Sequence, residues 1–340
     1  MTDPVAPGPR RRTARRMVVG GALLLMLGSA QASARQVHLT LLNTTDLHGS
    51  IRRTPGVYVD HNDGALLQCA TIIQTIRAEN PHTLLVDCGD VFQGTADSFL
   101  TQGGIMVQAM NALNYDAWAI GNHEFDWGLD RLGHLLRQMQ AVPLAANLVV
   151  GPRAPDGFER VQPYVMREID GLKVAIVGLT TPNLPQWFRG LADADLQVLK
   201  SRRALEQILP QIRRERPHIL VLLAHQGLMA RDDDANQIKA ICRRFSEFDV
   251  VLGGHLHWVL AGARIGRTDY AQAGSGGRGV MRVDMVYDTV KGAVIDKIFT
   301  YLPVAVDTPT DEDLAALVAD DLAQADRWLA TVLGHTPTAL

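Results

Sequence analysis

Five short polar motifs follow apolar stretches of the sequence, and their side chains are of the types that bind metal ions. The motifs are Asp46-Leu47-His48-Gly49, Gly89-Asp90, Gly121-Asn122-His123-Glu124, Ala224-His225 and Gly253-Gly254-His255-Leu256-His257. Carboxylate, amide-oxygen and imidazole donors without a thiolate cluster favour hard to borderline divalent ions. Glycines flank most of the donors, and a glycine lets the backbone turn sharply beside a small ion. Together the motifs predict a metal site.

Each motif is weak by itself, and its place in the chain gives it weight. An Asp after a Gly, as at Asp90, is usually a turn residue, and a histidine placed like His225 is, by itself, more often a core histidine or a helix cap than a metal ligand. Every motif, however, follows a predicted strand, and ligands in open α/β sheets gather beyond the carboxyl ends of strands. We therefore expect the five loops to converge on one cleft. In 46–48 and 255–257, the outer side chains of an extended tripeptide point to one side, so each pair is expected to bind from a single loop.

Strands and helices alternate along the chain between these motifs. The apolar patterns predict strands at 37–44, 83–86, 117–120, 142–148, 219–223 and 250–252, and helices at 65–79, 104–113, 129–140, 203–215 and 235–245. A hairpin is predicted at 164–169 and 173–178, around the turn Asp170-Gly171. Residues 257–302 read as short alternating strands. We predict an α/β fold, a four-layer α-β-β-α sandwich of two mixed sheets with helices outside.

A glycine-rich stretch and an acidic run are interpreted as structural. Residues 274–279 formally match GxGxxG, but an alternating strand pattern follows them, whereas a dinucleotide loop opens a helix. A glycine-rich turn is the better interpretation. Residues 232–234 are three aspartates, which we interpret as a solvated helix start rather than a cation site.

Composition excludes some partners and limits the role of the cysteines. The 340-residue chain has a formal net charge of −3, so no basic field favours duplex nucleic acid. Cys69, Cys88 and Cys242 are scattered through apolar segments and do not form a disulfide framework. We expect small buried hydrophobic side chains at all three positions, although an oxidising compartment would permit one disulfide.

Residues 1–34 resemble a targeting segment rather than part of the fold. Five arginines between positions 10 and 16 precede the apolar run 17–27, and small residues stand at 32–34. This pattern predicts a signal peptide and a periplasmic or secreted protein; an uncleaved anchor is the alternative. The arginine pairs suggest twin-arginine export, although the usual following Phe is missing. No later apolar run has the ~20 residues of a spanning helix, so we expect no transmembrane segment after cleavage.

The motifs, in this order and spacing, resemble the calcineurin-like metallophosphoesterases. Within them the chain is most similar to the exported 5′-nucleotidase and 2′,3′-cyclic-nucleotide phosphodiesterase branch. The closer similarity lies in residues 42–49, 87–94 and 121–128. The resemblance covers roughly residues 37–335, nearly the whole chain after the predicted signal peptide.

The resemblance implies a role for each residue of the motifs. One of two divalent ions (Mn, Zn, Fe or Co) would be held by Asp46, His48 and His257. The other would be held by Asn122, His225 and His255, with Asp90 bridging the two. His123 would act in catalysis, oriented by Asp126, and the substrate would contact Asn122 and His123. The implied function is an exported phosphoesterase acting on small phosphate esters, such as nucleotides or cyclic nucleotides.

The C-terminal region departs from the two-domain members of that family. Those proteins continue past a linking helix into a second domain that binds the nucleobase. Here residues 35–310 are expected to form the catalytic domain and 311–333 an amphipathic helix ended by Gly334. We expect the second domain to be absent, either in a natural single-domain relative or through truncation, and leave the partner of this helix open. Two alternatives also stay open: a hydrolase of sulfur esters on the same scaffold, and a non-catalytic binding protein that retains the metals.

Overall fold

The computed structural model describes residues 1–2, 8, 35–53 and 64–332. The predicted signal peptide lies almost entirely outside the described residues. Among the described residues, no helix combines the length and the apolar character needed to cross a membrane.

The first sheet has the strand order β14-β13-β1-β2-β3-β4. Its strands are β1 (Gln36–Thr44), β2 (Thr83–Asp87), β3 (Ala117–Ala119), β4 (Val142–Leu144), β13 (Gly279–Asp288) and β14 (Ala293–Pro303). β1 to β4 are parallel, and β13 and β14 are antiparallel to their neighbours. The sheet is therefore mixed. The glycine-rich stretch 274–279 leads into strand β13, as the alternating pattern predicts.

The second sheet has the order β11-β12-β10-β9-β7-β6. Its strands are β6 (Tyr164–Ile169), β7 (Leu172–Leu179), β9 (Ile219–Ala224), β10 (Val250–Gly253), β11 (Val259–Ile265) and β12 (Thr268–Ala273). The inner four strands are parallel, and β6 and β11 pair antiparallel at the edges. The β6–β7 hairpin is confirmed: Asp170 and Gly171 adopt φ of 51° and 79°, as a tight turn of this kind requires.

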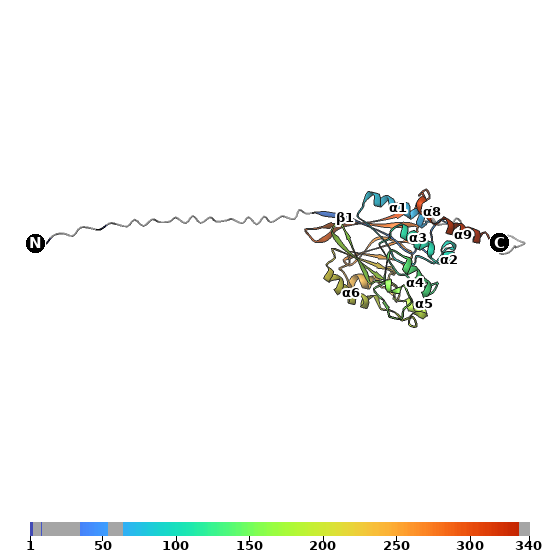
Figure 1. The fold of residues 1–340 in the computed structure, drawn as a ribbon, viewed down its shortest axis with the longest axis horizontal. Helices are drawn as coiled ribbons and strands as arrows, with labels where there is room; N and C mark the ends of the chain where they lie inside the picture. Colours follow the sequence, from blue (N-terminus) through green and yellow to red (C-terminus); the bar gives the residue numbers. More distant parts are fainter. Residues whose placement is uncertain (3–7, 9–34, 54–63, 333–340) are drawn as a thin grey trace. The chain divides into compact units, whose positions relative to one another are not determined.

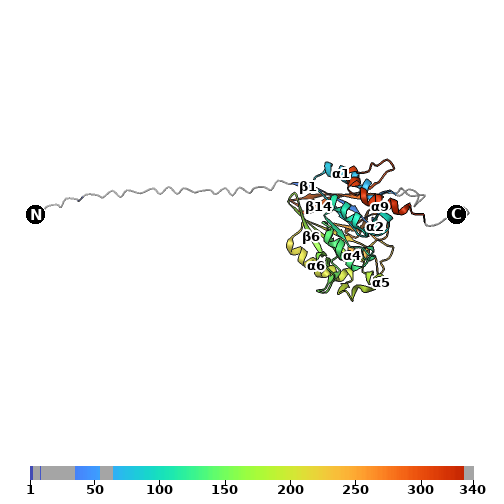
Figure 2. The same cartoon turned by 45° about the vertical axis from the view of Figure 1, so that its right-hand side comes forward.

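Three apolar cores separate four layers, so the predicted sandwich is confirmed. One core lies between the two sheets and contains Leu41 and Val221. A second packs the first sheet against α1 (Leu66–Glu79), α3 (Gly104–Ala112) and α4 (Leu129–Gln138). The third packs the second sheet against α6 (Ser201–Glu215) and α7 (Ile238–Arg244). Figures 1 and 2 show α1 and α6 on opposite sides of the paired sheets.

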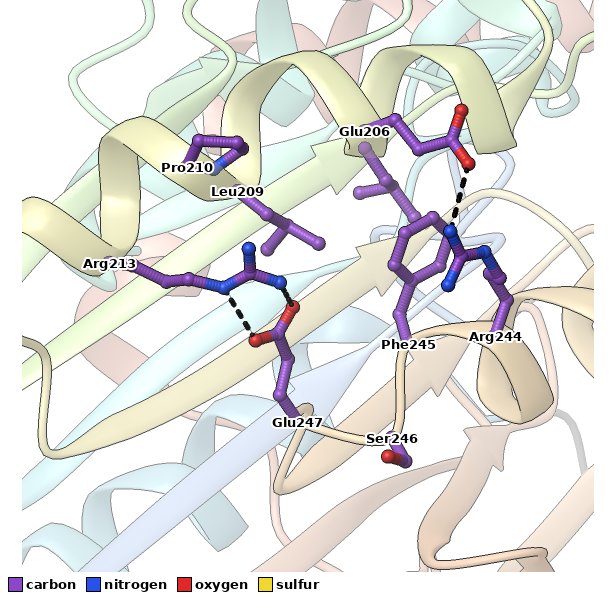
Figure 3. Close-up of a pocket in the computed structure, with 9 residues that line it drawn as sticks. Glu206, Leu209, Pro210, Arg213, Arg244, Phe245, Ser246 and Glu247 are labelled. Carbon is purple, nitrogen blue, oxygen red and sulfur yellow. Dashed lines mark hydrogen bonds and ion pairs between the residues drawn. The ribbon is translucent and has the colours of Figure 1, made fainter.

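The outer face of α6 and α7 carries polar contacts. Figure 3 shows a shallow pocket there, with Arg213 paired to Glu247 at 2.6 Å and Arg244 to Glu206 at 3.4 Å. The acidic run 232–234 contributes to the start of α7, because the Asp232 carboxylate accepts the backbone N–H groups of Lys239 and Ala240.

The predicted strand 142–148 is wrong in its second half. The chain leaves the first sheet after Leu144, and Leu148–Val150 forms β5, which pairs with β8 (Leu196–Val198) in a separate small sheet. The buried Asn147 causes the break. Its side chain accepts the backbone N–H of Thr180 and donates to the carbonyl of the same residue, both at 2.9 Å.

The predicted helix 311–333 is two helices, α8 (Glu312–Leu317) and α9 (Ala319–Leu329), divided at Val318. The bend lets Leu314 and Val318 join the core, where they are 3% and 1% exposed. The apolar face of α8 thus docks on the domain itself. By contrast α9 leaves Trp328 half exposed, and Gly334 lies outside the described residues.

Candidate metal centre

The five motif loops lie together at the carboxyl ends of β1, β2, β3, β9 and β10. Backbone hydrogen bonds join them: Asp46 N–H donates to the Gly89 carbonyl at 2.8 Å, and His48 N–H to that of Asp90 at 2.9 Å. Across the two sheets, His255 N–H donates to both carboxylate oxygens of Asp46, at 2.9 and 3.1 Å. The convergence expected from strand-end placement is therefore present.

Two of the flanking glycines are needed because other groups occupy the space of a side chain. A Cβ on Gly121 would lie 2.2 Å from Asp90 Oδ1, and one on Gly254 would lie 2.5 Å from Thr45 Oγ1. Any larger residue at either position would push the loops apart.

The candidate ligands form two adjacent groups. Asp46, His48 and His257 make the first group, and Asp90, His225 and His255 the second, each with donor atoms within 4.8 Å of one another. Asn122 joins the second group, because its Oδ1 lies 3.1 Å from His225 Nε2. Asp90 Oδ2 lies 3.1 Å from His225 Nε2 and 4.0 Å from His48 Nε2, so this carboxylate faces both groups.

The hydrogen-bond pattern of these groups fits bound cations. His225 Nδ1 lies 2.8 Å from the Cys88 carbonyl, an obligate acceptor, so Nδ1 carries the proton. Its Nε2 then faces two acceptors, Asp90 Oδ2 and Asn122 Oδ1, both at 3.1 Å. In the other group, His48 Nε2 and His257 Nε2 lie only 3.0 Å apart. The donor atoms of each group thus point toward one another, and together they could direct electron pairs at a divalent ion.

Burial and neighbouring charges shift the pKa values of these groups in different directions. Burial lowers the pKa of His225, but the charge and hydrogen bond of Asp90 and the charges of Asp46 and Glu124 together outweigh burial and raise that pKa to about 10. Burial raises the pKa of Asp90, but His225 outweighs it and lowers that pKa below its usual range. Burial lowers the pKa of His255 and of His257 to about 4, which leaves both imidazoles neutral and able to bind metal.

Five of the seven candidate ligands adopt left-handed backbone conformations. Their φ values are 50° at Asp46, 48° at His48, 59° at Asp90, 71° at His255 and 60° at His257. Such conformations cost about 1–3 kcal/mol each outside glycine and concentrate at functional sites. The expectation of extended tripeptides is therefore wrong. His255 and His257 do not bind as a pair but belong to different groups.

His123 and Asp126 form a pair at the edge of the centre. His123 Nδ1 lies 2.8 Å from Asp126 Oδ2, and both side chains are more than a third exposed. The hydrogen bond to Asp126 raises the pKa of His123. The His123 ring lies edge-on to that of His48, with centroids 5.3 Å apart. This imidazole belongs to neither ligand group and is open to a bound molecule.

The sequence pattern predicted no role for Glu124, whose side chain joins the loops that carry Asp90 and Asn122. Its buried carboxylate accepts three backbone N–H groups: Asp90 at 3.0 Å, Val91 at 2.6 Å and Gly121 at 2.6 Å. The position of Glu124 in the Gly-Asn-His-Glu motif could have predicted this role, because a glutamate next to a buried strand needs hydrogen-bond donors around it.

Comparisons with known proteins agree with this geometry. The family model described as "Calcineurin-like phosphoesterase" matches residues 39–259. The trifunctional nucleotide phosphoesterase protein YfkN of Bacillus subtilis is 30% identical over 68% of this chain and 17% of its own length. The 5′-nucleotidase of Bos taurus is 32% identical over 75% of this chain and 43% of its own. The chain thus spans less than half of these relatives.

The solved structure of a calcineurin-like phosphoesterase, YfkN from Bacillus subtilis, has the same fold. It superposes with a TM-score of 0.77 over 87% of this chain and 100% of the other, at 23% identity.

Proposed function

The chain belongs to the calcineurin-like phosphoesterases, a family of metal-dependent phosphoester hydrolases, and on that premise we propose that it hydrolyses small phosphate esters with two divalent ions. One observation carries the proposal: Asp90 Oδ2 lies 3.1 Å from His225 Nε2 in its own ligand group and 4.0 Å from His48 Nε2 in the other group. Two divalent ions bound there would polarise a phosphoryl oxygen and lower the pKa of a bound water to ~7.

The side chains of the centre hold the two ions and fix their positions. Asp46, His48 and His257 hold one ion, and Asn122, His225 and His255 hold the other. Asp90 lies between the two sets and fixes their spacing.

His123 faces the substrate. Asp126 keeps a proton on His123 Nδ1, so Nε2 can hydrogen-bond to the phosphate or protonate the leaving oxygen. Asn122, on the same loop as His123, also contacts the phosphate of the substrate.

Nucleotides are the substrates we propose within this class. The Bacillus and bovine relatives, a nucleotide phosphoesterase and a 5′-nucleotidase, support this choice. We also propose that the protein is exported to the periplasm or secreted, because the basic and then apolar residues 10–34 have the pattern of a signal peptide.

An activity screen after metal reconstitution tests the function. The purified protein, loaded with Mn²⁺, is assayed against nucleotides, cyclic nucleotides, sugar phosphates and thiosulfate esters, with phosphate and sulfate measured separately. We expect phosphate release from the nucleotides. Sulfate release alone would support a sulfur-ester hydrolase instead. Inactivity with every metal and substrate would support a non-catalytic binding protein.

A further inference from the structure

Trp187 is a half-exposed tryptophan that contacts a candidate metal ligand. Its side chain is 49% exposed, and its ring centroid lies 5.4 Å from that of His255, with the planes 37° apart. The His255 ring also lies 5.2 Å, between centroids, from the ring of the fully buried His225. Three rings therefore run outward from the centre to the surface, and the indole is the outermost.

The backbone around Trp187 is anchored by its neighbours rather than by the indole. Trp187 ends the single turn α5 (Leu184–Trp187), which lies between β7 and β8. Leu184 is fully buried, and the next residue, Phe188, packs on Phe125 with centroids 5.7 Å apart. A proline in the first turn fixes the local φ. The turn is held without burying the indole, which leaves a large aromatic face exposed beside the centre.

We propose that the exposed face of Trp187 stacks on the nucleobase of a nucleotide whose phosphate lies at the metal centre. This proposal rests on the proposed function and names the part of the substrate that the catalytic domain itself recognises. Every base has a π face, and stacking on an aromatic side chain is worth ~1–3 kcal/mol with little preference among bases. Trp187 thus selects phosphate esters that carry a base over those that carry only a sugar.

The chain offers a matched control for this residue. Trp328 on α9 is 52% exposed, almost the same as Trp187. Its ring contact is with Phe99, at 6.2 Å between centroids, and Phe99 is not a candidate ligand. An effect that depends only on removing an exposed indole will appear in both variants.

The test compares substrates with and without a base. Mn²⁺-loaded wild type, W187A, W187F and W328A are assayed for kcat/KM with adenosine 5′-monophosphate and with ribose 5-phosphate. In W187A we expect the preference for the nucleotide to fall ~5- to 100-fold, which corresponds to the stacking free energy. W187F retains most of the preference because a phenyl ring still stacks, and W328A retains all of it.

Several outcomes would overturn the proposal while the function stands. An equal fall with both substrates, accompanied by loss of bound metal, would show that Trp187 only supports the His255 ring. A wild type without preference for the nucleotide would also overturn it. If no substrate releases phosphate, the proposed phosphoesterase function is wrong, and this result by itself does not test the role of Trp187. Calorimetry then still tests the stacking role. It measures the affinity of adenosine 5′-monophosphate for the loaded wild type and for W187A, and equal affinities would reject stacking on Trp187.

Discussion

The carboxylate of Glu124 holds the backbone of Asp90, because its Oε2 accepts the Asp90 N–H at 3.0 Å. The same oxygen accepts Gly121 N–H, and Oε1 accepts Val91 N–H. A buried side chain that satisfies three N–H groups ties the loop after β2 to the loop after β3. The spacing between Asp90 and Asn122 therefore depends on a residue that belongs to neither ligand group.

Replacing Glu124 by Gln is expected to lower the stability of the metal-free protein. The amide NH₂ will face at least one N–H donor, and leaving a buried donor unpaired costs about 1–3 kcal/mol. Urea unfolding of the metal-free form measures the change. Glu159→Gln is the control, because Glu159 is exposed and, within the part of the chain that the structure describes, accepts one backbone N–H, that of Gly157. Equal changes in the two variants would contradict a positioning role for Glu124.

The two ligand groups predict separate losses of metal. His257→Ala removes a donor from the first group and His255→Ala removes one from the second. Each variant is expected to retain about one ion per chain where the wild type binds about two, since paired ions use distinct ligand sets. Elemental analysis after dialysis gives the stoichiometry. Loss of both ions in both variants would mean that the groups are not independent.

The docking of the C-terminal segment can be tested on α8 itself. Leu314 is 3% exposed, whereas Leu317 on the same helix is 51% exposed. Leu314→Ala should cost about 2–5 kcal/mol of unfolding free energy, because it leaves a cavity in the core. Leu317→Ala should change it by less than about 0.5 kcal/mol. Similar small effects in both would show that α8 does not pack on the domain in solution.

An ion-pair cluster remote from the ligand groups predicts a pH-dependent contribution to stability. Burial raises the pKa of Asp269, but Arg264, with Nη1 2.7 Å from each Oδ, and Lys297 outweigh burial and lower that pKa. A carboxyl whose folded pKa is depressed adds stability above its unfolded pKa, and this stability is lost as pH falls through the folded value.

The stability difference between wild type and Asp269→Asn should therefore be about 1 kcal/mol at pH 7, because Arg264 is largely exposed. It should shrink once the pH falls below the ordinary carboxyl value of 3.8. Unfolding curves at a series of pH values measure it. A difference that grows with acidity would have the wrong sign.

The sequence predicted the convergence of the loops because that property follows from topology. Parallel strands end at one edge of a sheet, so the loops after β1 and β2 meet without any local signal linking them, as His48 N–H and the Asp90 carbonyl do. The β6–β7 hairpin was equally predictable, since Asp170-Gly171 favours positive φ at both turn positions.

Features imposed by tertiary contacts were not predictable. The left-handed backbone at His255 and His257 opposes the local preference of histidine and exists because the surrounding loops hold it. The break at Asn147 depends on Thr180, a contact across two elements. Trp187 lies outside every motif, and only the folded chain places its ring on His255.

His123 gives the sharpest test of the catalytic assignment. Its ring belongs to neither ligand group, while its backbone N–H donates to Asp90 Oδ1 at 2.8 Å and is retained in any variant except proline. His123→Ala should therefore keep its metal and lose turnover by ~10²–10⁴-fold, the usual contribution of a positioned acid or base. Asp126→Asn should lose less, because the imidazole remains but its orientation and charge are weakened. His134→Ala, an exposed histidine on α4, should match the wild type. Steady-state kinetics and metal analysis on the same preparations measure both properties. If metal content falls together with turnover in His123→Ala, the side chain holds the ions in place and does not act on the substrate.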